Sequence, residues 1–234
     1  MKTNEIETTR KIFTHSTQRN LTYDDLLVEN STGGRAYVTP SGSRYPSITT
    51  VLGILSEESI REWRKRVGEE EANRISRKAA NRGTRLHLVA ERYLNNEEDY
   101  LKKELPHVVE LFKSIKPILD SRVDNIHLQE EALYSDHFQI AGRVDCIAEL
   151  DGVLTVIDYK TSSKQKKKEW ISSYFLQGSF YSAAYYEITG IPIQQTAIIM
   201  AVEGDEPQVF IEPTYTWLKQ LKDVRNEYRR RKGI

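Results

Sequence analysis

The 234-residue chain has little cysteine and no long apolar run, and these absences remove several classes of protein. Its single cysteine, Cys146, excludes an internal disulfide and a zinc or iron–sulfur site held by several cysteines. No run reaches the roughly 18 apolar residues that indicate a transmembrane helix. Because the first residues also lack the apolar centre of a signal peptide, we expect a soluble cytoplasmic protein that makes no membrane contact.

The chain also has no net charge. Its 34 Lys and Arg residues balance 34 Asp and Glu residues, so there is no overall attraction toward nucleic acid. The charge is locally uneven, because nine basic residues stand against four glutamates between Arg61 and Arg85, and residues 160–168 contain five lysines and no acid. A solvated helix face would give the same pattern. Nucleic-acid binding, if present, must therefore depend on these clusters.

Two β-rich runs, residues 144–150 and 153–161, are separated only by an Asp-Gly pair. Such a pair predicts a two-residue hairpin turn, because glycine tolerates positive φ. With that turn, counting outward along both strands places Asp145 directly opposite Asp158. Lys160 lies two residues further, so strand alternation puts its amine on the same face. Two carboxylates and an amine at one place suit a divalent metal, an attacking water and a phosphate.

The plain alternative is a solvated strand face on which Asp and Lys form surface ion pairs. Apolar residues on both faces argue against it, because they indicate a sheet that is covered on both sides. Carboxylates are seldom placed in such a sheet without a partner. The expected apolar residues are Ile147, Leu154 and Val156 on the face of the carboxylates, and Val144, Cys146, Leu150, Val153, Ile157 and Tyr159 on the other.

The remaining pattern predicts an α/β sandwich with a mixed sheet. Before the hairpin we expect a polar arm with a short helix near residues 23–28, a small hairpin over 35–47, and helices that begin after Ser47 and Ser56. Gly68 should end the second of these helices. At Gly83 we expect either a break in the long amphipathic helix that follows or a close approach by other backbone or a phosphate. The later elements are a helix over 101–116, three antiparallel strands that include 127–134, a helix over 169–188, two strands and a C-terminal helix.

Two further positions bear on the hairpin site. His87 lies one turn after Gly83, with Glu91 on the same helix face, although a lone helical histidine is more often structural. Glu130 and Glu131 are adjacent in the first predicted strand and must point to opposite faces. One of them should be solvated, and the other could join the site.

These pieces resemble the PD-(D/E)XK nuclease superfamily, and within it the RecB-like nucleases and the phage and bacterial exonucleases related to mitochondrial genome maintenance exonuclease. The resemblance covers about residues 45–190. It implies a restriction-endonuclease-like core, with residues 1–44 as an arm and small hairpin and residues 45–234 as one nuclease domain. It rests on RGTRLH ending in His87, EALY beginning with Glu131, GRVD ending in Asp145, IDYKT with Asp158 and Lys160, and QGSFY with Gln177 and Tyr181.

The resemblance implies a Mg²⁺- or Mn²⁺-dependent DNA exonuclease that acts on single strands or ends in replication, recombination or repair. His87, Asp145 and Asp158 would bind the metal, with Tyr159 offering a backbone carbonyl. Lys160 would assist the attacking water, and Glu131 would be a supporting acid. Gln177 and Tyr181 would contact DNA. From the local charge and aromatic residues we add Arg82, Arg85, Lys164 and Lys166 as phosphate contacts, and Trp63, Trp170 and Tyr174 as stacking surfaces, with a core role equally open for the aromatic residues.

Other readings remain open. The same fold could serve a structure-specific endonuclease, or a recombination module whose site is vestigial. No GxxxxGK[ST] loop occurs, so a helicase would be a separate partner. The expected setting is a bacterial cell or a phage-infected host, and both a monomer and a ring-shaped oligomer are compatible with the sequence.

Overall fold

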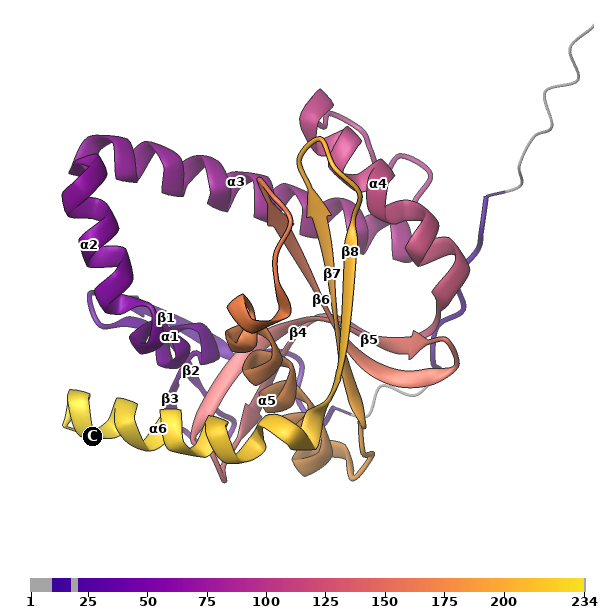
Figure 1. Ribbon diagram of the computed structural model, residues 1–234. Coiled ribbons are helices and arrows are strands. Elements are labelled where there is room, and N and C mark those ends of the chain that lie inside the picture. The colour runs from indigo at the N-terminus through magenta and orange to yellow at the C-terminus, as the bar shows by residue number, and fades with distance from the viewer. Residues whose placement is uncertain (1–9, 18–20, 234) are drawn as a thin grey trace, which may run out of the picture.

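A five-stranded sheet forms the centre of the computed structural model, which describes residues 10–17 and 21–233 (Figure 1). The strands lie in the order β4-β5-β6-β7-β8. β6 and β7 are parallel and all other neighbours are antiparallel, so the predicted mixed sheet is confirmed. The strands are β4 (Val123–Ser135), β5 (Ile140–Leu150), β6 (Val153–Ser162), β7 (Gln195–Val202) and β8 (Gln208–Pro213).

Helices cover both faces of this sheet, as the apolar residues on both sides of the hairpin strands predict. α3 (Glu69–Leu94) and α4 (Pro106–Arg122) pack on one face, where Cys146, Ile157 and Tyr159 are buried. α1 (Ile48–Leu52), α5 (Ser172–Thr189) and α6 (Leu218–Lys232) belong to the cluster on the other face, with Ile147 and Val156. Val144 also packs in this second cluster, and not on the face that simple alternation assigns to it.

A small antiparallel sheet precedes the core. Its strands are β1 (Leu27–Ser31), β2 (Gly34–Val38) and β3 (Arg44–Pro46). The predicted hairpin is therefore present as β2 and β3, but the helix expected near residues 23–28 is wrong. Each residue of β1 pairs with one of β2, from Leu27 with Val38 to Ser31 with Gly34, so the backbone groups of this stretch are satisfied by a strand partner.

The helical segment between the two sheets largely follows the predicted boundaries. The Ser47 hydroxyl accepts a 3.0 Å hydrogen bond from the backbone N–H of Thr50 and so caps α1. After η1 (Gly53–Leu55), α2 (Glu57–Val67) begins behind Ser56 and ends at Gly68, which has a φ of 87°. The predicted interruption at Gly83 is wrong, because α3 continues through it and a side chain there would meet no neighbour within 4 Å.

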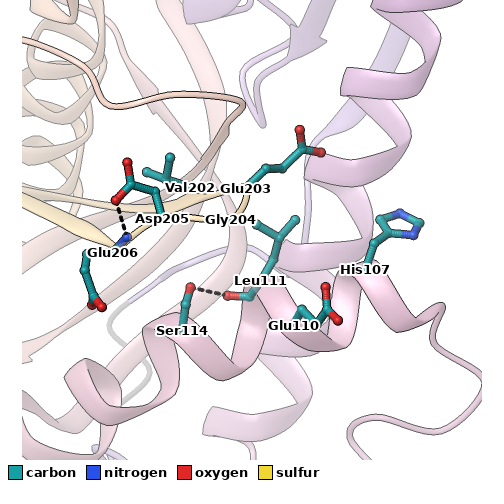
Figure 2. A pocket seen from close by; sticks show the side chains of 9 residues that line it. All are labelled: His107, Glu110, Leu111, Ser114, Val202, Glu203, Gly204, Asp205 and Glu206. Atoms are coloured by element: carbon teal, nitrogen blue, oxygen red, sulfur yellow. Dashed lines mark hydrogen bonds between the residues drawn. The ribbon is translucent and has the colours of Figure 1, made fainter.

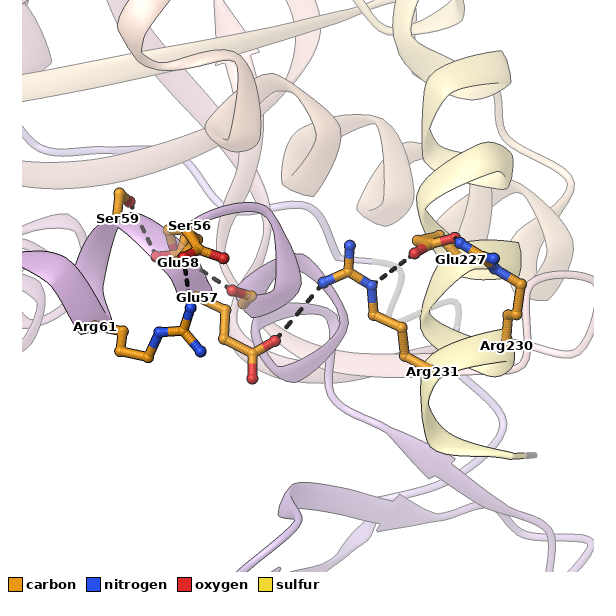
Figure 3. A network of polar contacts seen from close by, with 9 residues as sticks. Ser56, Glu57, Glu58, Ser59, Arg61, Glu227, Arg230 and Arg231 are labelled. Atoms are coloured by element: carbon orange, nitrogen blue, oxygen red, sulfur yellow. Dashed lines mark hydrogen bonds and ion pairs between the residues drawn. The ribbon is translucent and has the colours of Figure 1, made fainter.

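α2 and the first half of α3 form a limb (residues 57–81) that stands away from the sheet (Figure 1). No residue of α2 is buried, and all of residues 73–81 are exposed, so solvent reaches most of the limb, although Ala72 is buried. Polar contacts join the base of the limb to the end of α6 (Figure 3). Arg231 lies 3.8 Å from Glu57 and 2.6 Å from Glu227. These exposed pairs orient the limb more than they stabilise it.

The remaining elements follow from local sequence. Pro106 occupies the first turn of α4, where its missing N–H costs nothing. A short helix η2 (Lys168–Trp170) precedes α5, and Gly190 ends α5 with a left-handed φ of 73°. η3 (Thr214–Trp217) leads into α6. Among the described residues no helix combines the length and the apolarity that crossing a membrane requires.

Candidate active site

The turn between β5 and β6 sets the register of the candidate site. Asp151 and Gly152 both have positive φ, 53° and 76°, as a two-residue hairpin turn of this kind requires. The strands then pair as predicted, from Leu150 with Val153 to Cys146 with Ile157. The pairing of the two strands ends at Cys146 and Ile157, so Asp145 and Asp158 do not form the next pair. Instead, Asp145 Oδ2 accepts a 2.9 Å hydrogen bond from the backbone N–H of Tyr159.

The carboxylate of Asp158 is deeply buried beside Lys160. Lys160 Nζ lies 2.5 Å from each oxygen of this carboxylate, whose side chain is only 2% exposed. Burial raises the pKa of Asp158 to about 6, with a further contribution from the nearby Asp145 carboxylate and opposition from Lys160. A divalent cation bound beside this buried carboxylate would stabilise its charged form.

His87 reaches this hairpin from α3. Its Nε2–H donates a 2.6 Å hydrogen bond to the carbonyl oxygen of Tyr159. Its Nδ1 lies 3.5 Å from an oxygen of Asp145 and 4.0 Å from an oxygen of Glu130. His87, Glu130 and Asp145 each present one ligand atom within 4.8 Å of the other two. An imidazole nitrogen and carboxylate oxygens at this spacing fit a divalent cation.

The acid from β4 in this cluster is Glu130, whereas the sequence motif points to Glu131. Glu130 has a φ of 48°, a left-handed conformation that breaks the simple alternation of the strand. Burial, followed by the charge of Asp145, raises the pKa of Glu130 to about 7. Glu131 pairs with Val144 in the β4–β5 ladder and does not line the cavity described next. The structure thus places Glu130 beside His87 and Asp145, and the role of Glu131 as a supporting acid stays a prediction.

A cavity of about 680 Å³ opens in front of these groups. Its walls come from four regions of the sequence: the small N-terminal sheet with α1, the second half of α3, strands β4 to β6, and α5. The contribution of Arg35, Tyr37 and residues 47–49 could not be read from the sequence, because these residues reach the site only through tertiary packing. The other lining residues are Thr84, His87, Leu88, Glu91, Glu130, Gly142, Arg143, Asp145, Lys160, Tyr174, Gln177 and Tyr181.

The sequence profile of the PD-(D/E)XK nuclease superfamily matches residues 55–231, which include every group just described except those of the N-terminal sheet and α1. The chain belongs to this superfamily. Its mixed sheet flanked by helices is consistent with the restriction-endonuclease-like core of that superfamily, as the motifs predict.

Individual relatives agree with this assignment. The chain is 28% identical over 177 residues to mitochondrial genome maintenance exonuclease 1 of Homo sapiens, a match that covers 69% of this chain and 50% of the relative. The mouse protein of the same name is 29% identical over 129 residues, with 52% and 38% covered. The chain therefore spans half or less of the length of these curated relatives. A crystal structure of a protein from Eubacterium rectale, named as a candidate exonuclease, aligns with a TM-score of 0.36 and 15% identity. The alignment covers 64% of this chain and 68% of that one, and the two structures differ too much to support a functional inference.

Gln177 and Tyr181 lie in the wall of the cavity on α5. Tyr181 is buried, and its hydroxyl donates a 2.6 Å hydrogen bond to the carbonyl oxygen of Arg143, next to Gly142. A side chain at Gly142 would approach the Tyr181 hydroxyl to 2.9 Å, so this position must be glycine for the helix to pack here. The QGSFY motif therefore supports the wall, and its predicted contact with DNA stays a prediction.

Two of the predicted phosphate contacts are already engaged. Arg82 forms a 2.6 Å ion pair with Glu203 and a 3.0 Å hydrogen bond to Thr161, which ties α3 to the sheet. Arg85 lies 2.8 Å from Glu104, whose side chain is fully buried. Both guanidinium groups thus have structural partners that would compete with a phosphate. The sequence pattern could not show this, because the acids lie far away in the chain.

The candidates after β6 are more open. Lys164 is exposed, while Lys166 is half-buried and its backbone N–H donates to Gln208. Trp170 is 60% exposed. The Tyr174 ring centre lies 5.0 Å from Lys160 Nζ, so this aromatic residue borders the candidate catalytic lysine.

A different cavity, of about 630 Å³, lies between α4 and the turn after β7 (Figure 2). Its rim is acidic, with Glu110, Glu203, Asp205 and Glu206, and His107 stands at one end. Like charges repel a phosphate backbone, so this surface is a poor place for DNA. The predicted residues His87, Asp145 and Lys160 line the other cavity, described above.

Proposed function

We propose that this chain is a Mg²⁺- or Mn²⁺-dependent DNA exonuclease that acts on single strands or strand ends. The observation that carries the proposal is that His87, Asp145 and Lys160 line one cavity, with the buried Asp158 paired to Lys160. A divalent metal at such a site supplies two things to phosphodiester hydrolysis: a water of lowered pKa and positive charge beside the phosphate.

The chain's own residues have separable tasks in this mechanism. His87, Glu130 and Asp145 would hold the metal, with Asp158 as the further ligand that the motif predicts. The Tyr159 carbonyl lies within reach of the same imidazole. Asp145 is fixed by its bond to the Tyr159 N–H, so its free oxygen is oriented before anything binds. Lys160, charged and mounted on a strand, donates hydrogen bonds to the attacking water or to a phosphate oxygen.

Binding of a DNA strand beyond the cavity is supported by the limb. α3 carries His87 at its packed end and the exposed limb at its other end, so a strand that leaves the cavity meets solvated helices. Lys65, Arg66, Arg77 and Lys78 are exposed there and have no acid partner in the described part of the chain. Cations of this kind hold a phosphate backbone without reading its sequence.

The test is a degradation time course on oligonucleotides labelled at the 5′ or the 3′ end, as single strands, duplexes and RNA. We expect Mg²⁺-dependent release of short products from single-stranded DNA, and no release in a chelator. A closed circular single strand should stay intact. Cutting of the circle would favour the endonuclease alternative, and binding without hydrolysis of any substrate would favour the vestigial one.

A further inference from the structure

A smaller cavity adjoins the candidate active site beside α1 and α5. Its volume is about 350 Å³, and Thr49, Tyr174 and Gln177 line both cavities, so the two share a wall. One side of the smaller cavity comes from residues 49–56 and the other from residues 170–177. Its remaining lining residues are Leu52, Gly53, Leu55, Ser56, Trp170, Ser172 and Ser173.

Two large apolar side chains are left open to solvent in this cavity. Trp170 is 60% exposed and Leu55 is 49% exposed, and they stand on opposite sides. Apart from the Lys167 ammonium 5.5 Å from its ring centre, the Trp170 side chain has no ring contact or hydrogen bond in the described part of the chain. Exposed indole surface beside a cation is the kind of surface on which a nucleobase stacks.

The smaller cavity also connects to the catalytic groups. Tyr174 lies in the shared wall, with its ring centre 5.0 Å from Lys160 Nζ. A phosphate placed at Lys160 would therefore leave a neighbouring base at the opening between Tyr174 and Trp170. Lys164 is exposed on the segment that leads from β6 to Trp170 and adds positive charge there.

We propose that this cavity is a subsite for one unpaired nucleobase of the substrate strand, which stacks on Trp170 while an adjacent phosphate lies at Lys160. The proposal rests on the proposed function and names its substrate class. A base in a duplex must first leave the stack and lose its partner, which costs energy that an unpaired base does not need. The subsite thus selects single strands and frayed ends, and it tolerates every base because each has a π face.

The first experiment measures binding in a chelator, by fluorescence anisotropy, so that hydrolysis plays no part. The probes are a labelled oligothymidine strand and an abasic strand of equal length. Wild-type protein should bind the thymidine strand about 5- to 150-fold more tightly. Trp170→Ala and Trp170→Leu should lose most of this preference, whereas Trp170→Phe should retain part of it because it keeps a π face. Tyr215→Ala is the matched control, because Tyr215 is 72% exposed and lines neither cavity.

A wild-type protein that binds both strands equally, or a Trp170→Ala variant that keeps the full preference, would overturn the subsite. The second experiment follows Mg²⁺-dependent hydrolysis of strands with a single abasic position, moved one nucleotide at a time from the cleaved end. One position should show a slower rate in the wild type and not in Trp170→Ala, and a flat profile in the wild type would also overturn the subsite. If the protein binds the thymidine strand more tightly than the abasic strand but hydrolyses neither, the proposed function is refuted and the subsite proposal is still supported.

Discussion

The ammonium of Lys160 lies 2.5 Å from the carboxylate of Asp158, and together they form a buried ion pair one residue on either side of Tyr159. Burial alone would lower the pKa of Lys160, but the carboxylates of Asp158 and Asp145 outweigh it and the pKa is raised. Lys160 is therefore a cation at neutral pH. It acts on water or phosphate as a hydrogen-bond donor and a positive charge, and not as a neutral base.

Replacing Lys160 by methionine should separate activity from folding. We expect Lys160→Met to lower the hydrolysis rate by at least about 10²- to 10³-fold, because a positive group beside the phosphate is lost. The variant should stay folded but lose about 3 kcal/mol of unfolding free energy without metal, because Asp158 is left buried without its partner. Single-turnover hydrolysis and urea unfolding measure the two effects.

The double variant Lys160→Met/Asp158→Asn is the control for this interpretation. It removes both charges, so it should regain much of the lost stability while it remains inactive. If Lys160→Met hydrolyses DNA at the wild-type rate, the role assigned to this lysine is wrong.

Glu130 and Glu131 provide a matched pair of substitutions. Glu130→Gln removes an oxygen from the group formed with His87 and Asp145, and should weaken Mg²⁺ or Mn²⁺ binding about 10- to 100-fold. Glu131→Gln changes the adjacent position in β4, which does not line the cavity, and should leave metal affinity within about twofold. Calorimetric titration of each variant with Mn²⁺ decides between them. A larger loss in Glu131→Gln would restore the assignment that the motif gives.

The hairpin and the two glutamates differ in how far the sequence predicts them. The hairpin register was predictable, because Asp-Gly permits only a few turn geometries and a fixed turn fixes every pair beyond it. The positive φ of Glu130 was not, because no local pattern marks it, and the Arg143 side chain from β5 donates to the Glu130 carbonyl oxygen. A local irregularity of one residue exchanges the side chains that reach the site.

Long-range packing accounts for the other differences. The pairing of Arg82 with Glu203, and of Arg85 with Glu104, joins residues more than a dozen positions apart that no local pattern relates. The N-terminal sheet brings Tyr37 into the cavity for the same reason. Helix ends at Gly68 and Gly190 were predictable, because only glycine adopts their positive φ without strain.

Metal binding should depend on pH through the raised pKa of Glu130, near 7. A carboxyl group whose pKa is raised by folding favours the folded state in its protonated form. Its contribution to stability without metal is therefore full below the ordinary pKa of 4.5 and is lost as the pH rises through about 7. A divalent cation binds the deprotonated form and competes with these protons.

Mg²⁺ should accordingly raise the melting temperature more at about pH 8 than at about pH 5.5. Thermal melts in chelator and in excess Mg²⁺ at both pH values provide the measurement. Glu130→Gln should flatten the difference, because it has no proton to exchange. Equal gains at the two pH values in the wild type would contradict the prediction.

Gly142 and Gly83 should respond in opposite ways to alanine. At Gly142 the new methyl group would lie 2.9 Å from both the Tyr181 hydroxyl and Ile48 Cγ2, and both side chains are buried. We expect Gly142→Ala to cost about 1–3 kcal/mol of unfolding free energy. Gly83→Ala meets open space inside α3 and should add about 0.5–1 kcal/mol. Urea unfolding of both variants tests this, and a stabilised Gly142→Ala would refute the close packing.

The limb should hold the phosphate backbone through charges that lack protein partners. Changing Lys65, Arg66, Arg77 and Lys78 to glutamine should weaken the binding of single-stranded DNA and reduce the slope of log affinity against log salt by about 0.7 for each cation that contacts a phosphate. Lys219→Gln/Lys222→Gln is the control, because these exposed lysines lie on α6 beside a separate cavity. Because these four side chains are exposed, melting temperatures should stay unchanged, so a loss of binding reports on charge alone. A salt slope equal to that of the wild type in the limb variant would mean that the strand leaves the site by another route.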